Sequence, residues 1–357
     1  MTETIYVNKK TNKDLKRVEV EMNKMMNKMF TKMNNLFNDQ FNVIVNQIST
    51  IETQIDRINE KLWPNYFYLE AINNATITVN GLGTGELKYT KTPDDESSWT
   101  TETISSGSTF NITLDAGEKC YFFGDITTSG YGSVTFVTTD PITCGGNVYY
   151  VADKNGILSK NDQCHSMFNG CTGLTVAPAL PATTLTEASY SSMFNGCTGL
   201  TTTPELPATT LATRCYRSLF EDCTGLTSAP ELPATTLATE CYREMFSSCT
   251  GLTSAPLLPA TTLAKGCYRS MFNSCLGLTS APLLPATTLT EVCYSRMFDS
   301  CTQLNYVKCL ATDMTATGCT TNWLRSVAST GTFVKDANTT WSTGVDGIPS
   351  GWTIEDE

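Results

Sequence analysis

A cysteine that recurs every 26 residues is the feature that most constrains the fold of this chain. It occurs at Cys171, Cys197, Cys223, Cys249, Cys275 and Cys301, with no insertion between the copies. A fixed period of about 20 to 30 residues with regularly spaced leucines is typical of a solenoid, because each short unit is too small to bury its apolar residues alone. We therefore expect stacked coils in which each Leu, Cys and Phe lies over its copy in the next coil.

Each repeat contains two blocks of sequence. The first reads Cys-Thr-Gly-Leu-Thr-x-x-Pro-x-Leu-Pro-Ala-Thr-Thr-Leu in four copies, has Leu276 for the threonine in the copy from Cys275 and is lost in the copy from Cys301. The second reads Cys-Tyr-x-x-Met-Phe-x-x-Cys, with Ser189 for the first cysteine in one copy and Leu219 for Met in another. We expect the Leu-Thr-x-x-Pro-x-Leu segment to form a short strand that the prolines end, and the second block to form one or two helical turns. The chain has 15 cysteines, an odd number, and no export signal is apparent. We therefore expect reduced, buried thiols that act as small apolar groups, with disulfide bonds as the alternative.

The solenoid is expected over residues 151–326, as six units that include a divergent last copy from Cys301. The segment 164–171 has the sequence of a half-unit and leads into the first full repeat. A tail that contains Gly and Trp, residues 327–357, is expected to cover the last coil, because terminal repeats need a cap.

Residues 12–65 have the pattern of one long helix. Apolar residues recur in steps of three and four from Leu15 to Leu62, with Gln40 counted as a polar member of the seam, and no Pro or Gly occurs before Pro64. Such a helix is on the order of 70 Å long at about 1.5 Å per residue, too long for a compact domain of this chain to cover. We therefore expect a coiled-coil stalk, preceded by an N-terminal anchor at residues 1–11.

Isoleucine at both seam positions in the last turns of this stalk favours three strands over two. We expect a parallel homotrimer, with a dimer or a helix folded back on its own chain as the alternatives. The residues expected in the oligomer interface are Ile44, Ile48, Ile51, Ile55, Ile58 and Leu62.

Residues 66–150 change to alternating apolar and polar residues, as in Thr76-Ile77-Thr78-Val79. Short strands of this kind, separated by clusters of Gly, Asp and Ser, predict a small β-sandwich module. The predicted fold class is therefore a multi-domain chain with an N-terminal α-helical coiled coil, a small β-sandwich and a C-terminal leucine-rich-repeat solenoid of α/β repeats.

The repeat unit resembles the Treponema-type, or BspA-like, leucine-rich repeat. That family's pattern of Leu-x-x-Ile-x-Leu-Pro, then Phe-x-x-Cys, is matched here by Leu226 with Leu232-Pro233 and by Phe246-Ser247-Ser248-Cys249. The unit runs longer than the family's usual repeat and has Cys-Tyr and Met-Phe where the family often has Gly-x-x-Ala-Phe. The version with Leu-Pro-Ala-Thr-Thr-Leu is similar to repeats encoded by gut Bacteroidetes and their phages, including crAss-like phages. The resemblance implies surface display and attachment, and in phages a fibre or decoration protein.

Composition and spacing disfavour catalysis, metal binding and nucleic-acid binding. The net charge is −11 and His165 is the only histidine, so we expect no histidine-dependent catalytic or metal site. A nucleic-acid surface needs clustered Lys and Arg. Glu205 and Glu231 share a repeat position, but their next copies are Leu257 and Leu283, so we interpret this column as a solvated face. We expect no enzyme activity and no cofactor. We also expect no membrane insertion, since no stretch reaches about 18 apolar residues.

Positions that change from copy to copy are better ligand candidates than unchanging ones, which stacking already explains. Changing charges lie beside the repeated tyrosines, and Arg and Tyr together suit sugar or protein surfaces. Drift of unconstrained solvent positions is the alternative. The candidate ligand face comprises Arg214, Tyr216, Arg217, Glu240, Tyr242, Arg243, Lys265, Tyr268 and Arg269.

These features predict a structural virion protein, a phage head fibre or capsid decoration, made in the host cytoplasm. Its N terminus would bind a capsid or tail protein, and its repeats would project toward host-surface glycan or protein. Multiple copies would convert weak contacts into avidity. A phage tail fibre or receptor-binding protein, and an adhesin on the bacterial cell surface, are the alternatives.

Overall fold

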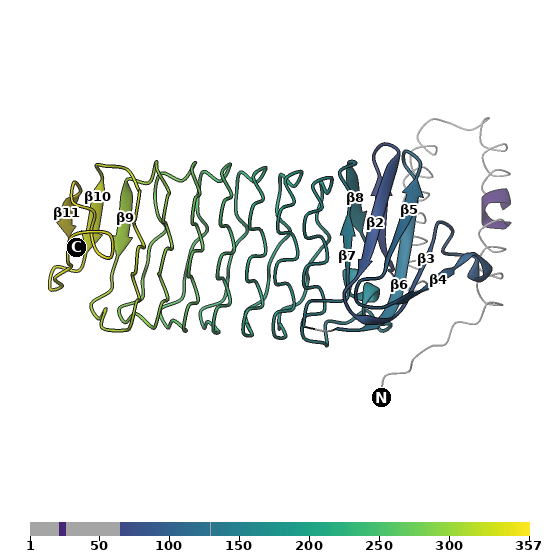
Figure 1. Cartoon of the computed structure of the whole chain (residues 1–357), viewed down its shortest axis with the longest axis horizontal. Helices are drawn as coiled ribbons and strands as arrows, with labels where there is room; N and C mark the ends of the chain where they lie inside the picture. The colour runs from purple at the N-terminus through teal and green to yellow at the C-terminus, as the bar shows by residue number, and fades with distance from the viewer. Residues whose placement is uncertain (1–20, 26–64, 129) are drawn as a thin grey trace. The chain divides into compact units, whose positions relative to one another are not determined.

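The computed structural model describes residues 21–25, 65–128 and 130–357 (Figure 1). The chain divides into two compact units, Met1–Asn65 and Tyr66–Glu357.

In the first unit, residues 21–25 are helical, and Lys24 forms an ion pair of 2.8 Å with Glu21. The remainder of the predicted anchor and stalk, with all six interface residues from Ile44 to Leu62, lies outside the described residues. Within the described ranges there is no coiled coil, so the trimeric stalk stays a prediction. No helix in these ranges is both long and apolar enough to cross a membrane.

The second unit begins with two antiparallel sheets (Figure 1). The five-stranded sheet has the order β4 (Thr100–Ile104), β3 (Thr84–Thr90), β6 (Lys119–Thr127), β1 (Phe67–Ala71) and β8 (Ile142–Gly145). The three-stranded sheet has the order β5 (Thr109–Leu114), β2 (Ala75–Gly81) and β7 (Val134–Val137). Two short 3-10 helices, η1 (Glu96–Ser98) and η2 (Val148–Val151), follow β3 and β8. The sheets share a core, since Phe122 of β6 contacts Phe136 of β7 with 4.9 Å between ring centroids. The predicted β-sheet region is confirmed.

Both sheets lead into the first coil of the solenoid. The Phe136 amide of β7 donates a hydrogen bond of 2.8 Å to the Met167 carbonyl. The Ile142 amide of β8 donates one of 2.9 Å to the Gly173 carbonyl. The Phe136 ring also contacts Phe168 of the first coil, with 5.8 Å between centroids. The sheets therefore cover the apolar end of the first coil and serve as its cap.

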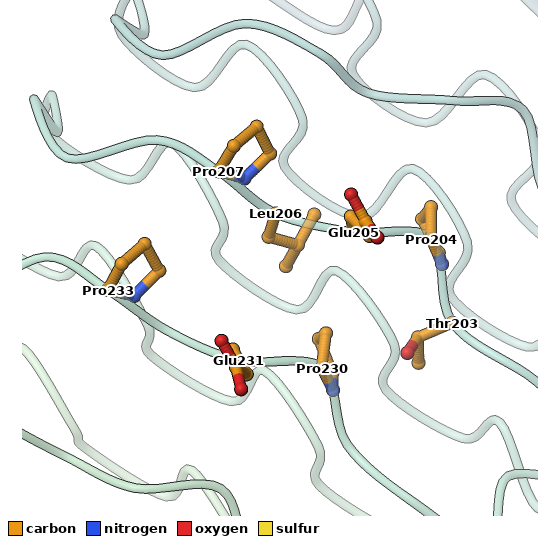
Figure 2. A pocket seen from close by; sticks show the side chains of 8 residues that line it. All are labelled: Thr203, Pro204, Glu205, Leu206, Pro207, Pro230, Glu231 and Pro233. Atoms are coloured by element: carbon orange, nitrogen blue, oxygen red, sulfur yellow. The ribbon is translucent and has the colours of Figure 1, made fainter.

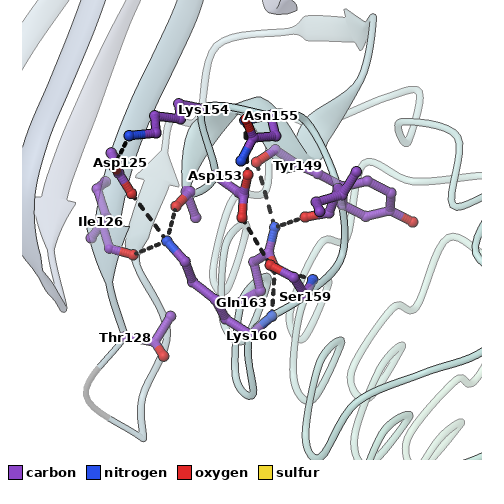
Figure 3. Close-up of polar contacts among 12 residues, drawn as sticks. Asp125, Ile126, Thr128, Tyr149, Asp153, Lys154, Asn155, Ser159, Lys160 and Gln163 are labelled. Carbon is purple, nitrogen blue, oxygen red and sulfur yellow. Dashed lines mark hydrogen bonds and ion pairs between the residues drawn. The ribbon is translucent and has the colours of Figure 1, made fainter. Parts of the chain in front are cut away.

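Lys160 fastens the loop after η2 to this cap (Figure 3). Its ammonium group donates hydrogen bonds to the carbonyls of Ala152 at 2.7 Å and Ile126 at 3.1 Å, and lies 3.3 Å from the Asp125 carboxylate. The side-chain oxygen of buried Gln163 accepts a hydrogen bond of 3.1 Å from the Lys160 amide. Because the donors of Lys160 are engaged by the protein itself, this cluster is a structural joint.

Identical side chains stack from coil to coil and form the core. The phenylalanine ladder contains Phe168, Phe194, Phe220, Phe246, Phe272 and Phe298, with neighbouring centroids 5.5–5.8 Å apart. The tyrosine ladder contains Tyr190, Tyr216, Tyr242, Tyr268 and Tyr294, with neighbouring centroids 5.8–6.2 Å apart. These spacings are favourable for aromatic pairs. The predicted stack of 26-residue repeats is confirmed.

The Cys-Tyr-x-x-Met-Phe block forms a series of turns, so the prediction of helical turns was wrong. Every second amide donates to the next coil, as the Tyr190 amide does to the Cys215 carbonyl at 3.0 Å. The amides between them close turns, as the Met193 amide does to the Tyr190 carbonyl at 3.2 Å. A left-handed residue at every fourth position interrupts the i to i−4 bonding that an α-helix needs. One column of such residues contains Ala188, Arg214, Glu240, Gly266, Val292 and Gly318, with φ between 49° and 63°.

The Pro-x-Leu-Pro side of the coils does not form the strand that the sequence predicted. Proline has no amide N–H, so Pro282 and its copies cannot donate to a neighbouring coil, and only isolated parallel bridges occur. Strands form where the prolines are lost. β9 (Tyr306–Cys309) has Lys308 at the repeat position of Pro282, and it pairs in parallel with β10 (Thr332–Lys335). β10 pairs in turn with β11 (Thr353–Asp356), also in parallel.

Trp341 and Trp352 of the tail cover the last coil, to which Trp323 belongs. Trp341 stacks on Trp323 with 5.3 Å between ring centroids. The indole N–H of Trp323 donates a hydrogen bond of 2.8 Å to the Gly347 carbonyl, and that of Trp352 donates one of 2.8 Å to the Ala328 carbonyl. The tail thus closes the second apolar end of the stack.

The left-handed column yields a matched pair of variants. Val292 is the β-branched member of this column and is strained at φ 49°. We predict that Val292→Gly raises the free energy of unfolding in urea by about 1 kcal/mol. Gly266→Val, in the same column at φ 59°, should lower it by at least as much. Changes of the same sign in both variants would contradict the strain.

Candidate functional site

The cysteines belong to the core and do not form a reactive site. All 15 are free and buried. From Cys197 onward in the repeated column, each thiol donates a hydrogen bond to a phenylalanine carbonyl of the previous coil, as Cys223 does to Phe194 at 3.0 Å and Cys249 does to Phe220 at 3.0 Å. Burial raises the pKa of Cys223 to about 12. These thiols are therefore protonated at neutral pH, and the thiolate needed for attack or metal binding is not formed.

His165 lies at the start of the solenoid beside Asp162. Its imidazole is 3.3 Å from the Asp162 carboxylate, and both side chains are mostly buried. Burial lowers the pKa of His165, and the carboxylate only partly opposes this, so the ring is mainly neutral at pH 7. In residues 21–25, 65–128 and 130–357, no three His, Cys, Asp or Glu side chains are grouped as metal ligands.

The tyrosines of the predicted ligand face do not reach solvent. Tyr216, Tyr242 and Tyr268 are each 1% exposed and stack within the core. The placement of these three rings on a binding face was therefore wrong. Each left-handed residue turns the backbone, so the tyrosine points inward while charged residues next to it in sequence stay at the surface.

The charged members of the predicted face, which we call the charged face, do lie at or near the surface: Arg214, Arg217, Glu240, Arg243, Lys265 and Arg269. Most of them pair within the protein. Arg214 lies 2.9 Å from Glu187 and Lys265 lies 2.8 Å from Glu291, each pair joining adjacent coils. Arg243 lies 2.9 Å from Glu240. Exposed pairs of this kind contribute little to stability, but they leave few free charges for a ligand.

A different surface carries hollows between coils. We call it the proline face, defined by Pro204, Pro207, Pro230, Pro233, Pro256 and Pro259 with the residues between them. A hollow of about 350 Å³ spans two coils and is lined by Thr203, Pro204, Glu205, Leu206, Pro207, Pro230, Glu231 and Pro233 (Figure 2). A second hollow, of about 270 Å³, continues onto the coil of Pro256 and Leu257 and shares Glu231 with the first. The two form one shallow groove across three coils.

One exposed column lies between the two rows of prolines. Glu205 and Glu231 lie at matching places on adjacent coils (Figure 2). The next two copies are Leu257, which is 80% exposed, and Leu283, which is 44% exposed. Neither glutamate has an ion pair or hydrogen bond within the described part of the chain. The sequence predicts this column only as a solvated face. The available signal was a large apolar residue, Leu257, at a position where the two preceding copies are glutamates.

Comparisons with protein-family models, with curated proteins and with solved structures found no match. The fold and the groove define a capped solenoid repeat protein.

The tyrosine ladder makes a prediction that separates packing from binding. The buried hydroxyl of Tyr242 has no hydrogen-bond partner, whereas the Tyr190 hydroxyl bonds to that of Tyr149. We predict that Tyr242→Phe leaves the free energy of unfolding unchanged or raises it by about 1 kcal/mol, and that Tyr190→Phe lowers it by about 1 kcal/mol. Urea unfolding measures both. A clear loss in Tyr242→Phe would mean that its hydroxyl binds a water or ligand.

Proposed function

We propose that this protein is a non-enzymatic structural protein of a virion, a phage head fibre or capsid decoration. In this proposal the N-terminal residues bind the particle, and the solenoid projects for attachment to host-surface glycan or protein. The observation that carries the proposal is the groove of the proline face, which presents similar shallow sites on successive coils. Such a surface suits many weak contacts with an extended ligand rather than turnover of a small substrate.

The arrangement of the second unit supports display. The chain enters this unit at Tyr66, next to β1 in the sheets that cap the first coil, and the tryptophan cap lies at the other end of the stack (Figure 1). Attachment through the preceding residues would leave the length of the solenoid accessible. The continuous aromatic ladders make the coils one packed body, which favours a stiff support for a binding surface.

The same proposal includes the homotrimeric coiled coil over residues 12–65. Its support is the isoleucine spacing, which favours more than two strands. Once one of three linked solenoids has bound a ligand on the host surface, the other two grooves are held near that surface at a high effective concentration. The linkage would therefore strengthen binding without new contacts.

Competition for adsorption tests this function. Purified full-length protein should block adsorption of the virions that carry it to host cells. The variant Ile51→Asp/Ile55→Asp, which puts charge into the proposed seam, should be monomeric by light scattering and block adsorption only at about 100-fold higher concentration.

The control is Lys24→Ala, whose side chain is exposed and pairs with Glu21 within the described residues 21–25. It should block adsorption like the original chain. The proposal would be contradicted if the protein were absent from purified virions, or if it hydrolysed host-surface glycan or protein and released the products.

A further inference from the structure

We propose that the proline face docks an extended polypeptide strand with a basic side chain two residues before an apolar one. This inference rests on the proposed attachment function and names the chemical class of its ligand. The contacts of the groove support it in four steps.

The backbone of the groove is not used by the solenoid. No backbone hydrogen bond joins residues 203–208 to residues 229–234, or residues 229–234 to residues 255–260. On the opposite side of the same coils, every second amide bonds to the next coil. Backbone N–H and C=O groups require partners, so these segments have free hydrogen-bonding capacity for a ligand. A peptide that crosses the coils cannot pair along its length with these segments as an added strand, so side-chain contacts must give its specificity.

The two glutamates favour a cation. Glu205 and Glu231 lie on adjacent coils of the first hollow, and Figure 2 shows them at equivalent positions. Coils at the spacing of parallel strands place equivalent residues about 5 Å apart, where like charges repel. The charged face contains basic residues, but none of them pairs with Glu205 or Glu231, and neither glutamate has a partner among residues 21–25, 65–128 and 130–357. One Lys or Arg side chain from a ligand would relieve the repulsion of both carboxylates.

The next coil favours an apolar side chain. Leu257 is 80% exposed and lies in the second hollow between Pro256 and Pro259. The midpoint of the two glutamates and Leu257 are about 7 Å apart at the spacing of stacked strands. That is the distance between side chains i and i+2 on one face of an extended strand, about 6.6 to 7 Å. A peptide that runs across the coils therefore matches both subsites at once.

The lining of the groove disfavours a glycan. It contains prolines, leucines, two carboxylates, threonine and alanine, and no aromatic ring among its residues. A sugar over Leu257 would lose the hydration of its hydroxyl groups without a polar partner. A peptide side chain such as leucine or phenylalanine gains from burial at the same place.

Labelled full-length protein on an array of immobilised peptides, each about 12 residues long, tests the inference. One set carries Lys or Arg two residues before Leu, Phe or Trp, and the matched set has the same composition with the two residues separated. We expect binding to the first set. Glu205→Lys/Glu231→Lys and Leu257→Glu should each weaken the Kd of the best peptide by about tenfold or more.

Two controls keep the test independent of folding. Glu86→Lys/Glu355→Lys makes the same change of net charge at exposed positions outside the groove, and its Kd should match that of the original chain. A peptide with Glu in place of its basic residue should bind the Glu205→Lys/Glu231→Lys variant better than the original chain. The inference would be overturned if no peptide bound, or if the control variant lost as much affinity as the groove variants. It would also be overturned if neutral glycans bound the original chain and no longer bound the groove variants.

The outcomes also separate the two proposals. If the protein blocks virion adsorption but binds no peptide of the first set, the docking inference fails and the attachment function stands. If the Glu-containing peptide binds the Glu205→Lys/Glu231→Lys variant better than the original chain, but the protein is absent from virions, the attachment function fails and the groove remains a peptide site.

Discussion

The contact of each side chain with its own copy one coil away holds this structure together. The phenylalanine and tyrosine rings of neighbouring units stack on one another, and a cysteine thiol donates a hydrogen bond to a phenylalanine carbonyl of the previous unit. A single unit has no other apolar surface on which to bury these groups, so its stability comes from its neighbours. The two ends lack a neighbour, and the β-sheets and the tryptophan tail cover them.

Neighbouring coils are held together by different interactions on the two sides of a coil. On the turn side, left-handed residues aim every second amide at the next coil and satisfy the others locally. On the proline side, the missing amide hydrogens prevent a ladder, and side-chain burial of residues such as Leu232 holds the coils together. The backbone amides of the turn side have hydrogen-bond partners, whereas the proline side has backbone polar groups without a partner in the neighbouring coil. This asymmetry explains why the binding groove lies on the proline face rather than among the paired charges.

The sequence carried enough information for the coils but not for the direction of every side chain. The cysteine period and the phenylalanine repeat predicted the stack because their spacing allows no other common burial. Tyr216 and its copies were placed outward because charged residues flank them and tyrosine often lies at surfaces. The left-handed turns point these rings inward. The residue types at Arg214 and Glu240 do not predict a left-handed conformation. The strand prediction failed because two prolines per coil remove the donors that a ladder needs. The groove was missed because unchanging prolines were explained by stacking alone, although the exposed Leu257 broke the pattern of its column.

Deletion of whole and partial repeats tests the dependence on equivalent contacts most directly. Removal of residues 224–249, one complete period, joins Cys223 to the next unit and restores every ladder. This protein should keep a single cooperative thermal transition with a slightly lower midpoint. Removal of residues 224–236, half a period, places each side chain over the wrong neighbour and should abolish the cooperative transition. Similar transitions in both deletions would contradict the account.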